Sequence, residues 1–311
     1  MGRGEGDQRG GLDMTSSVHG AGGQSFSSLA VELEDNAVSV VDMQAIRLTP
    51  MQCVQLFKIM KGNTSVHTLL CNDNPLEDAG ATSLAEVLDS NPNLTVLDLS
   101  HTSVGVSGAA ALARGVRKAK GLQELYLGQS GWWANAMGDM GAKAFAEALA
   151  THKSLSRVEL QYNGIGIQGG VALAEAMGNN DEVSHLNLSF NSIRDDAIYH
   201  VAQMLVKNGR LQCLDLSGNQ FGPTGGTHLS VALKENGTLQ RLYLSQNNLG
   251  SQGAKALSQS FVLNRGLVEV DLTDNNLGTA GGLFVGDCLM NNRILRKLDL
   301  SSNSLGDDGV A

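Results

Sequence analysis

Apolar residues recur along this chain with a long, fixed period. The segment LQRLYLSQN begins at Leu239, and segments of the same form, LQCLDLSGN and VSHLNLSFN, begin at Leu211 and Val183. Ten such units begin at residues 38, 66, 94, 122, 155, 183, 211, 239, 267 and 295. Every spacing is 28 residues except one of 33, so the chain is a tandem repeat.

The first part of each unit predicts a short strand. Its fourth and sixth positions are apolar and alternate with polar positions, as expected for a strand with one buried face. Asparagine often takes the ninth position, as at Asn191 and Asn219. We expect its side chain to turn inward and bond the backbone where the strand ends, because a buried amide needs partners. Ile46 and Thr102 interrupt this column, so those two turns must be satisfied differently.

The second part of each unit predicts a helix. A glycine column, including Gly169 and Gly225, precedes apolar residues at helical spacing. Asparagines such as Asn208 and Asn236 often close the helix, where we expect a left-handed cap. One strand and one helix cannot bury their apolar faces alone, so the units must stack on a shared core. The strands then form an inner parallel sheet, and the wider helices bend the stack into a horseshoe.

The unit LxxLxLxxNxLGxxGxxxLAxxL resembles the ribonuclease-inhibitor class of leucine-rich repeats over residues 38–311. The resemblance implies an α/β fold, a right-handed leucine-rich-repeat solenoid (horseshoe) with an inner parallel sheet and outer helices. It gives a domain of ten units, the last of them incomplete. A truncated product is the expected explanation, because the chain stops at Ala311 before that unit's helix. Ahead of the domain we expect a disordered tail at 1–27, rich in Gly, Ser and Gln, and a lead-in segment at 28–37.

Members of this class bind unrelated proteins, so the resemblance implies a protein–protein interaction scaffold. The alternative is a GTPase-activating protein for a Ran-type small GTPase, because such activators belong to the same class. Ribonuclease inhibitor itself is cysteine-rich and alternates two repeat types. Here there are four cysteines and one evident repeat type, so ribonuclease binding is not implied.

Charge and cysteine usage narrow the function classes. The net charge of −9 disfavours nucleic acid as a partner, and the local cluster Arg114, Arg117, Lys118 and Lys120 falls at a helix end, where cations are favourable. The four cysteines lack metal or disulfide spacing, which predicts reduced thiols in a cytoplasmic protein. No window has the length of a membrane span. We therefore expect no membrane, nucleic-acid or small-molecule ligand.

The sequence also gives no sign of catalysis. The GxGxxG pattern at 164–169 coincides with the glycine columns of the repeat, so it predicts no cofactor. The seven histidines occupy different repeat positions and form no visible catalytic or metal-binding set. The sequence therefore predicts a non-enzyme without cofactor or metal.

One exposed column on the concave strand face is a candidate binding surface. Six of its ten members are acidic, which would attract a protein with a basic surface. Consensus habit explains the aspartates equally well, because LDLS is common in this repeat class. The column consists of Asp42, Leu70, Asp98, Tyr126, Glu159, Asn187, Asp215, Tyr243, Asp271 and Asp299.

The longer unit at Leu122 supplies a second candidate. Its five extra residues lie within GQSGWWA (128–134), which contains Trp132 and Trp133. Tyr162 and Phe190 occupy nearby strand-exit positions, and exposed aromatics commonly anchor interfaces. In the alternative interpretation the tryptophans fold into the core. The predicted protein-binding residues are Tyr126, Trp132, Trp133, Glu159, Tyr162, Phe190, Asp215, Tyr243 and Asp271.

Overall fold

A computed structural model of the protein describes residues 26–129 and 135–310. Trp132 and Trp133 lie outside the described residues, as does the predicted tail up to residue 25. Helix α1, Phe26–Glu34, covers most of the predicted lead-in segment and precedes the first strand.

Strands and helices alternate through the described residues. Each strand is three residues long and each is followed by a helix. The strands are β1 Val40–Asp42, β2 Thr68–Leu70, β3 Val96–Asp98, β4 Glu124–Tyr126, β5 Arg157–Glu159, β6 His185–Asn187, β7 Cys213–Asp215, β8 Arg241–Tyr243, β9 Glu269–Asp271 and β10 Lys297–Asp299. The helices are α2 Pro50–Met60, α3 Glu77–Ser90, α4 Val106–Lys118, α5 Gly138–Leu149, α6 Ile167–Met177, α7 Arg194–Lys207, α8 Pro223–Glu235, α9 Gly250–Leu263, α10 Gly278–Leu289 and α11 Gly306–Val310.

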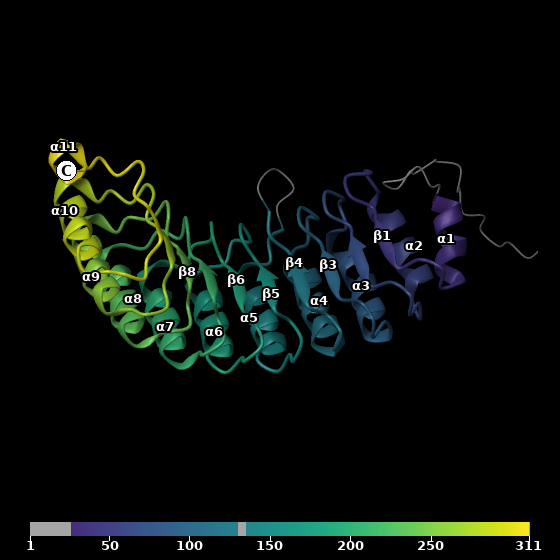
Figure 1. Ribbon diagram of the computed structural model, residues 1–311. Helices are drawn as coiled ribbons and strands as arrows, with labels where there is room; N and C mark the ends of the chain where they lie inside the picture. The colour runs from purple at the N-terminus through teal and green to yellow at the C-terminus, as the bar shows by residue number, and fades with distance from the viewer. Residues whose placement is uncertain (1–25, 130–134, 311) are drawn as a thin grey trace, which may run out of the picture.

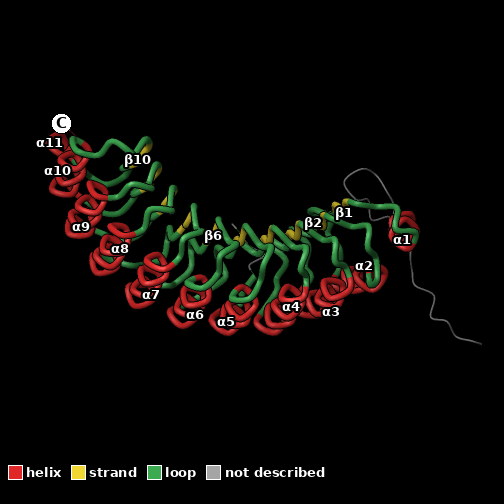
Figure 2. Tube along the Cα trace, turned by 60° about the horizontal axis from the view of Figure 1, so that its bottom comes forward, coloured by secondary structure: helices red, strands yellow, loops and turns green. Residues whose placement is uncertain are grey.

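The strands form one parallel sheet in chain order, β1 to β10. Each residue pairs with its equivalent in the next unit, as Leu214 does with Leu242. The register is kept across the longer unit, where Leu125 pairs with Val158. Figures 1 and 2 show the strands along the inner side of the arc and the helices along its outer side. The predicted α/β repeat solenoid is confirmed.

The core is a continuous layer between sheet and helices. The middle residue of each strand from β1 to β9 is buried, while the first and third residues of β2 to β9 are half-buried on the concave face. Leu216 and Leu244 were expected on strands and instead directly follow them, fully buried. Helices approach closely at the glycine column: a Cβ on Gly169 would lie 2.8 Å from that of Ala142.

The asparagine column forms the predicted ladder at the strand ends. Asn191 donates its amide to the carbonyl oxygens of Leu160 in the preceding unit (3.1 Å) and Leu188 in its own (2.9 Å). Its Oδ1 accepts the N–H groups of Asn163 and Ile165, both at 3.0 Å. Each asparagine therefore joins two units and satisfies backbone groups that the turn leaves buried.

The two interruptions of this column are satisfied from the following unit. Near Ile46, Asn74 Oδ1 accepts the N–H of Leu48 at 2.9 Å. The hydroxyl of Thr102 donates to Leu99 O at 2.6 Å, and Asn135 Oδ1 accepts from the backbone N–H of Val104 at 2.9 Å. Asn135 thus takes the ladder position of the longer unit, as the sequence spacing indicated.

The asparagines that close the helices form a second ladder, and the expected left-handed cap is wrong. Asn208 and Asn236 have φ of −78° and −76°, which is extended backbone. The Asn236 amide donates to Leu205 O at 2.7 Å, and its Oδ1 accepts the Leu239 N–H at 2.9 Å. Asparagine is therefore suited to this column by the hydrogen bonds that its side chain makes between units.

From α3 to α8 the units alternate between two types, whereas α9, α10 and α11 all begin with a glycine at positive φ; the expectation of one repeat type is thus corrected for α3 to α8. In α4, α6 and α8 an extended glycine precedes the helix, and an aspartate of the preceding unit accepts its N–H; Asp139 does so for Gly166 at 2.7 Å. Helices α3, α5 and α7 instead begin with Glu77, Gly138 and Arg194, all at positive φ. Because the aspartate always comes from the other type, the two types fit together as pairs.

Candidate protein-binding surface

The third residues of the strands form the predicted column on the concave face, where they are half-buried rather than fully exposed. Asp215 accepts the N–H of Ser217 at 2.9 Å, two residues further along the chain. Asp42, Asp98, Asn187, Asp271 and Asp299 make the same bond. An aspartate or asparagine in this column therefore has a structural task at the strand end, whether or not a partner binds.

The remaining members of this column are Leu70, Tyr126, Glu159 and Tyr243. Three of them lie on the central strands β4, β5 and β8. The Tyr126 hydroxyl donates to Glu124 on the same strand. Burial and this bond to the carboxylate raise the pKa of Tyr126. Glu159 pairs with Arg157, with 3.1 Å between Nη1 and Oε1. The side chains of Tyr126, Glu159 and Tyr243 therefore do not make the strand-end backbone bond and lie on the concave face.

A hollow of about 280 Å³ lies between these positions. Residues from β5 to β8 line it, including Arg157, Glu159, His185, Cys213 and Arg241. Arg157, His185 and Arg241 are first residues of their strands, a column that the sequence reasoning did not consider. The signal was present as two arginines and a histidine at the third position of three units.

The hollow brings together charges of both signs. Burial is the main reason that the pKa of Asp215 lies above its usual value, and Glu159 and Asp271 raise it further. Burial also lowers the pKa of His185, and the nearby cations Arg157 and Arg241 act in the same direction. The concave wall is therefore not a uniformly acidic line at its centre.

The rim where the strands end carries an aromatic pair. The rings of Tyr162 and Phe190 stack with 4.4 Å between centroids and 4° between planes. The ring of Phe190 also covers Gly218, where an added Cβ would lie 2.5 Å from the ring edge. Tyr162 is 37% exposed. A flat aromatic surface therefore crosses two units on the solvent side of the sheet edge.

Both aromatic residues adopt a left-handed backbone, with φ of 57° at Tyr162 and 53° at Phe190. This conformation belongs to the repeat, because the residues at the equivalent position of the other units share it, namely Ala45, Asp73, His101, Gly218, Gln246, Asp274 and Ser302. Bulky side chains rarely adopt it, whereas Gly, Asn and Asp do so readily. The fold alone therefore does not select aromatic residues here.

The structure thus gathers part of the predicted set. Glu159, Asp215 and Tyr243 line the hollow, and Tyr126 lies on the adjacent strand β4. Tyr162 and Phe190 lie at the strand exits of β5 and β6. Asp271 lies on β9 beyond the hollow. Trp132 and Trp133 are outside the described residues.

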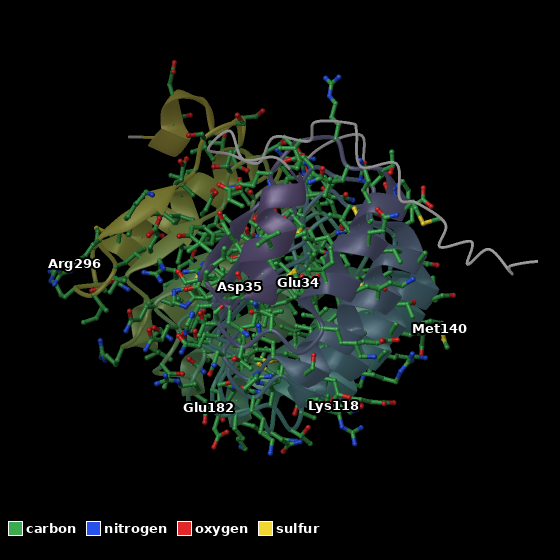
Figure 3. The ribbon with its side chains drawn as sticks, turned by 90° about the vertical axis from the view of Figure 1, so that its right-hand side faces the viewer. Glu34, Asp35, Lys118, Met140, Glu182 and Arg296 are labelled. Atoms are coloured by element: carbon green, nitrogen blue, oxygen red, sulfur yellow. The ribbon has the colours of Figure 1, made fainter. Side chains whose placement is uncertain are left out.

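Within residues 26–129 and 135–310, no group of histidine, cysteine and carboxylate side chains could hold a metal ion. None of the helices in these two ranges is both long and apolar enough to cross a membrane. Lys118 of the basic helix end points away from the repeat body in Figure 3 and pairs with Asp89 at 2.8 Å.

Known proteins share this repeat. Residues 90–113, 151–174, 210–230, 235–258, 264–286 and 291–311 match a family model described as Leucine Rich repeat. The chain is 24% identical over 136 residues to the protein phosphatase 1 regulatory subunit 37 homolog of Caenorhabditis briggsae, covering 44% of this chain and 15% of that protein.

Two further relatives are similar over comparable lengths. The Tonsoku-like protein of Mus musculus is 32% identical over 120 residues, covering 39% of this chain and 9% of that protein. The NACHT, LRR and PYD domains-containing protein 5 of Bos taurus is 30% identical over 139 residues, covering 44% of this chain and 12% of its own length. The chain therefore spans 15% or less of each of these three relatives.

Proposed function

The chain belongs to the leucine-rich-repeat proteins of the ribonuclease-inhibitor type, and on that premise we propose that it is an interaction scaffold rather than an enzyme. Its binding surface comprises the strand-exit rim at Tyr162 and Phe190 and the concave face around Tyr126, Glu159 and Tyr243. Repeat domains of this type generally bind proteins, which supports the proposal for the chain as a whole.

The observation that carries the proposal is the stacked pair Tyr162 and Phe190. The pair occupies backbone positions that favour small or polar residues, and one of the two rings is substantially exposed. Rigid aromatic surfaces contribute large contact areas at interfaces. Placing them at a conformationally unfavourable position is best explained by a role in contact rather than in folding.

The concave face supports the same site. Asp215 and Asp271 remain part of the proposed surface, although each also holds its own strand end. Tyr126, Glu159 and Tyr243 replace the usual aspartate or asparagine without taking over that bond. These departures lie next to the rim pair, on β4 to β8, so rim and concave face form one surface.

The partner is another protein, and its identity is a separate question. Two of the relatives carry the name of protein phosphatase 1 regulatory subunits, which makes that phosphatase a first candidate for direct testing. A Ran-type GTPase is the corresponding test of the activator alternative. Strong stimulation of its GTP hydrolysis by the chain would replace the scaffold proposal.

The experiment is affinity capture with matched variants. The wild-type chain, a Tyr162→Asn/Phe190→Asn double variant and a Tyr199→Ala control serve as baits, and captured proteins are identified by mass spectrometry. Asparagine suits the left-handed backbone, so the double variant should fold normally. Tyr199 is an exposed tyrosine on the outer helix α7, so its replacement shows the effect of removing an exposed aromatic ring outside the proposed surface.

The proposal predicts a set of proteins captured by wild type and by Tyr199→Ala but lost with the double variant. Each rim aromatic should contribute about 2 kcal/mol or more of binding free energy if it is a hot spot. Unchanged capture by the double variant would contradict the proposed surface. Equal loss with Tyr199→Ala would show that the outer face binds instead.

A further inference from the structure

The first residues of the strands form a second column on the concave face, which we call the first column. It consists of Val40, Thr68, Val96, Glu124, Arg157, His185, Cys213, Arg241, Glu269 and Lys297. Unlike the third column, it has no consensus residue, and no residue type occurs in it more than twice. Its members are therefore free to vary without disturbing the backbone bonds that hold the repeat.

Most charged side chains of the first column have compensating partners nearby. Glu124 accepts the hydroxyl of Tyr126. Arg157 pairs with Glu159 at 3.1 Å. Glu269 pairs with Lys297 at 2.6 Å. In this column, each of these charges is already neutralised or hydrogen-bonded before any partner arrives.

Arg241 differs from these neighbours. Its Nη2 donates to Nε2 of His185 at 2.8 Å, reaching across the intervening strand β7. Cys213 on that strand lines the same hollow as the guanidinium. Among the described residues, no carboxylate forms an ion pair with it. A half-buried cation is thus held by a neutral imidazole at the edge of an open hollow.

The orientation of Arg241 is fixed by a short chain of hydrogen bonds. Because arginine can only donate, Nε2 of His185 must accept, and the proton lies on Nδ1. That proton is directed to Ser184 Oγ at 2.8 Å, and the hydroxyl of Ser184 donates to the Ser156 carbonyl at 3.2 Å. One of the five guanidinium donors is therefore used by His185, and the guanidinium lines a hollow with other polar groups.

We propose that Arg241 is the anchor for a single carboxylate, supplied by an acidic side chain of the protein that binds the concave face. This deepens the proposed function and rests on it. Guanidinium and carboxylate form strong, geometrically specific pairs. A partly desolvated cation whose neighbouring carboxylate, Glu269, is already paired with Lys297 gains more from such a pair than an exposed cation does.

The surrounding charges favour a carboxylate over a phosphate group. Glu159 and Asp215 line the same hollow from the third column. Their negative charges would repel a phosphate monoester, whose charge at neutral pH is −1.5 to about −2, more strongly than a carboxylate. The bound segment must therefore present an acidic residue to the first column and neutral or basic residues to the third. This refines the expectation of a simply basic partner.

The test is a titration of the isolated chain followed by nuclear magnetic resonance. The probe is blocked aspartate, acetyl-Asp-N-methylamide, with the matched blocked asparagine as its uncharged control. The signals are the Arg241 Nε–H, the His185 ring and the backbone amides of β6 to β8. Arg241→Gln removes the charge, Arg241→Lys keeps the charge without the fork, and Lys297→Gln changes a cation of the same column that already has a partner.

The proposal predicts saturable shifts with blocked aspartate in wild type and in Lys297→Gln. Binding should weaken at least about tenfold in Arg241→Gln and with blocked asparagine, which corresponds to losing one ionic pair. Arg241→Lys should fall between them. Equal shifts in Arg241→Gln, or no saturable shift in wild type, would overturn the assignment. Tighter binding of inorganic phosphate at matched ionic strength would also overturn it.

This titration needs no natural partner, so its outcome is independent of affinity capture. Loss of the anion site with retained capture by the rim would contradict only the assignment of Arg241. Loss of capture with intact anion binding would contradict only the proposed interaction surface.

Discussion

Two neighbouring contacts between consecutive units, here called joints, differ in the hydrogen bonds that their asparagines make. Between the units that begin at Leu155 and Val183, Asn191 satisfies backbone groups of both units through its Oδ1 and Nδ2. Between the units that begin at Leu122 and Leu155, Asn163 still donates to Leu127 O at 2.9 Å. Its Oδ1, however, has no hydrogen-bond partner among the described residues.

Gln129 replaces the missing half of the ladder at the second joint. The Gln129 Oε1 accepts the N–H of Asn135 at 2.7 Å, which Asn163 would otherwise receive. Its amide donates to Tyr162 O, directly at the aromatic rim. The register of the sheet is preserved in spite of this change. The apolar layer therefore keeps the units in register even where the polar ladder has different hydrogen bonds, as it does beside the aromatic pair Tyr162 and Phe190.

The largest expected effect concerns the apolar layer, which is continuous across both joints. Leu216→Ala and Leu160→Ala should each lower the free energy of unfolding by roughly 2–5 kcal/mol, because both side chains are fully buried and leave cavities. Urea denaturation measures both. Asp215→Ala, one residue before Leu216, should cost only about 1 kcal/mol for its single backbone bond. A cost at Asp215 equal to that at Leu216 would show that the assignment of buried and exposed positions is wrong.

The second prediction separates the two joints. Asn191→Ala should destabilise the protein by about 1–3 kcal/mol, because buried backbone donors and acceptors in two units would lose their hydrogen-bond partner. Asn163→Ala should cost less, because no N–H group loses its acceptor there. The same denaturation experiment compares them. Equal losses would show that Gln129 has not taken over the accepting role at the irregular joint.

The third and smallest effect concerns His152, which replaces asparagine in the second ladder of the longer unit. Its Nε2 donates to Ala119 O at 3.2 Å, and its Nδ1 accepts the N–H groups of Ser154 and Leu155. This pattern requires a neutral ring. Burial lowers the pKa of His152 below 6.5, while its bond to the Ala119 carbonyl raises it in part.

The sign of the pH dependence follows from this shift. Below pH 6.5 the unfolded chain binds a proton that the folded ring resists, so the free energy of unfolding falls as the pH falls. The contribution is complete above pH 6.5. His152→Asn restores the usual residue and should flatten this part of the profile. His185, whose pKa is also lowered, remains in both proteins, so the difference between the two profiles isolates His152. Identical profiles would contradict the assigned role.

Much of the fold could be predicted from the sequence because the same pattern of buried and exposed positions recurs in ten units. Alternation with period two gave the buried faces of the strands, and the fixed spacing gave the register. The conformation of Asn208 and Asn236 could not be predicted in this way. An asparagine at a helix end fits both a left-handed cap and a side-chain bond, and only the neighbouring unit decides between them.

The candidate site was predictable only in part. Tyr162 and Phe190 occupy the same position of consecutive units, so their proximity follows from the register. Arg241 and His185 were not predicted from the sequence because the first column has no consensus residue. Their contact also crosses an intervening strand, so no local sequence pattern indicates it. The alternation of unit types was also hidden, because it depends on backbone conformation at Gly105 and Glu77 rather than on apolar spacing.

We propose that departures from the repeat on the strand side, and not the outer helices, form the binding surface. Hydrogen exchange of the free chain and of its complex with a captured protein distinguishes the two faces. In the complex we expect slower exchange at the strands and strand exits of β4 to β8, including Tyr162, Phe190 and Arg241, with exchange in α5 to α8 unchanged. Protection confined to α5 to α8, with the strand exits unaffected, would contradict it.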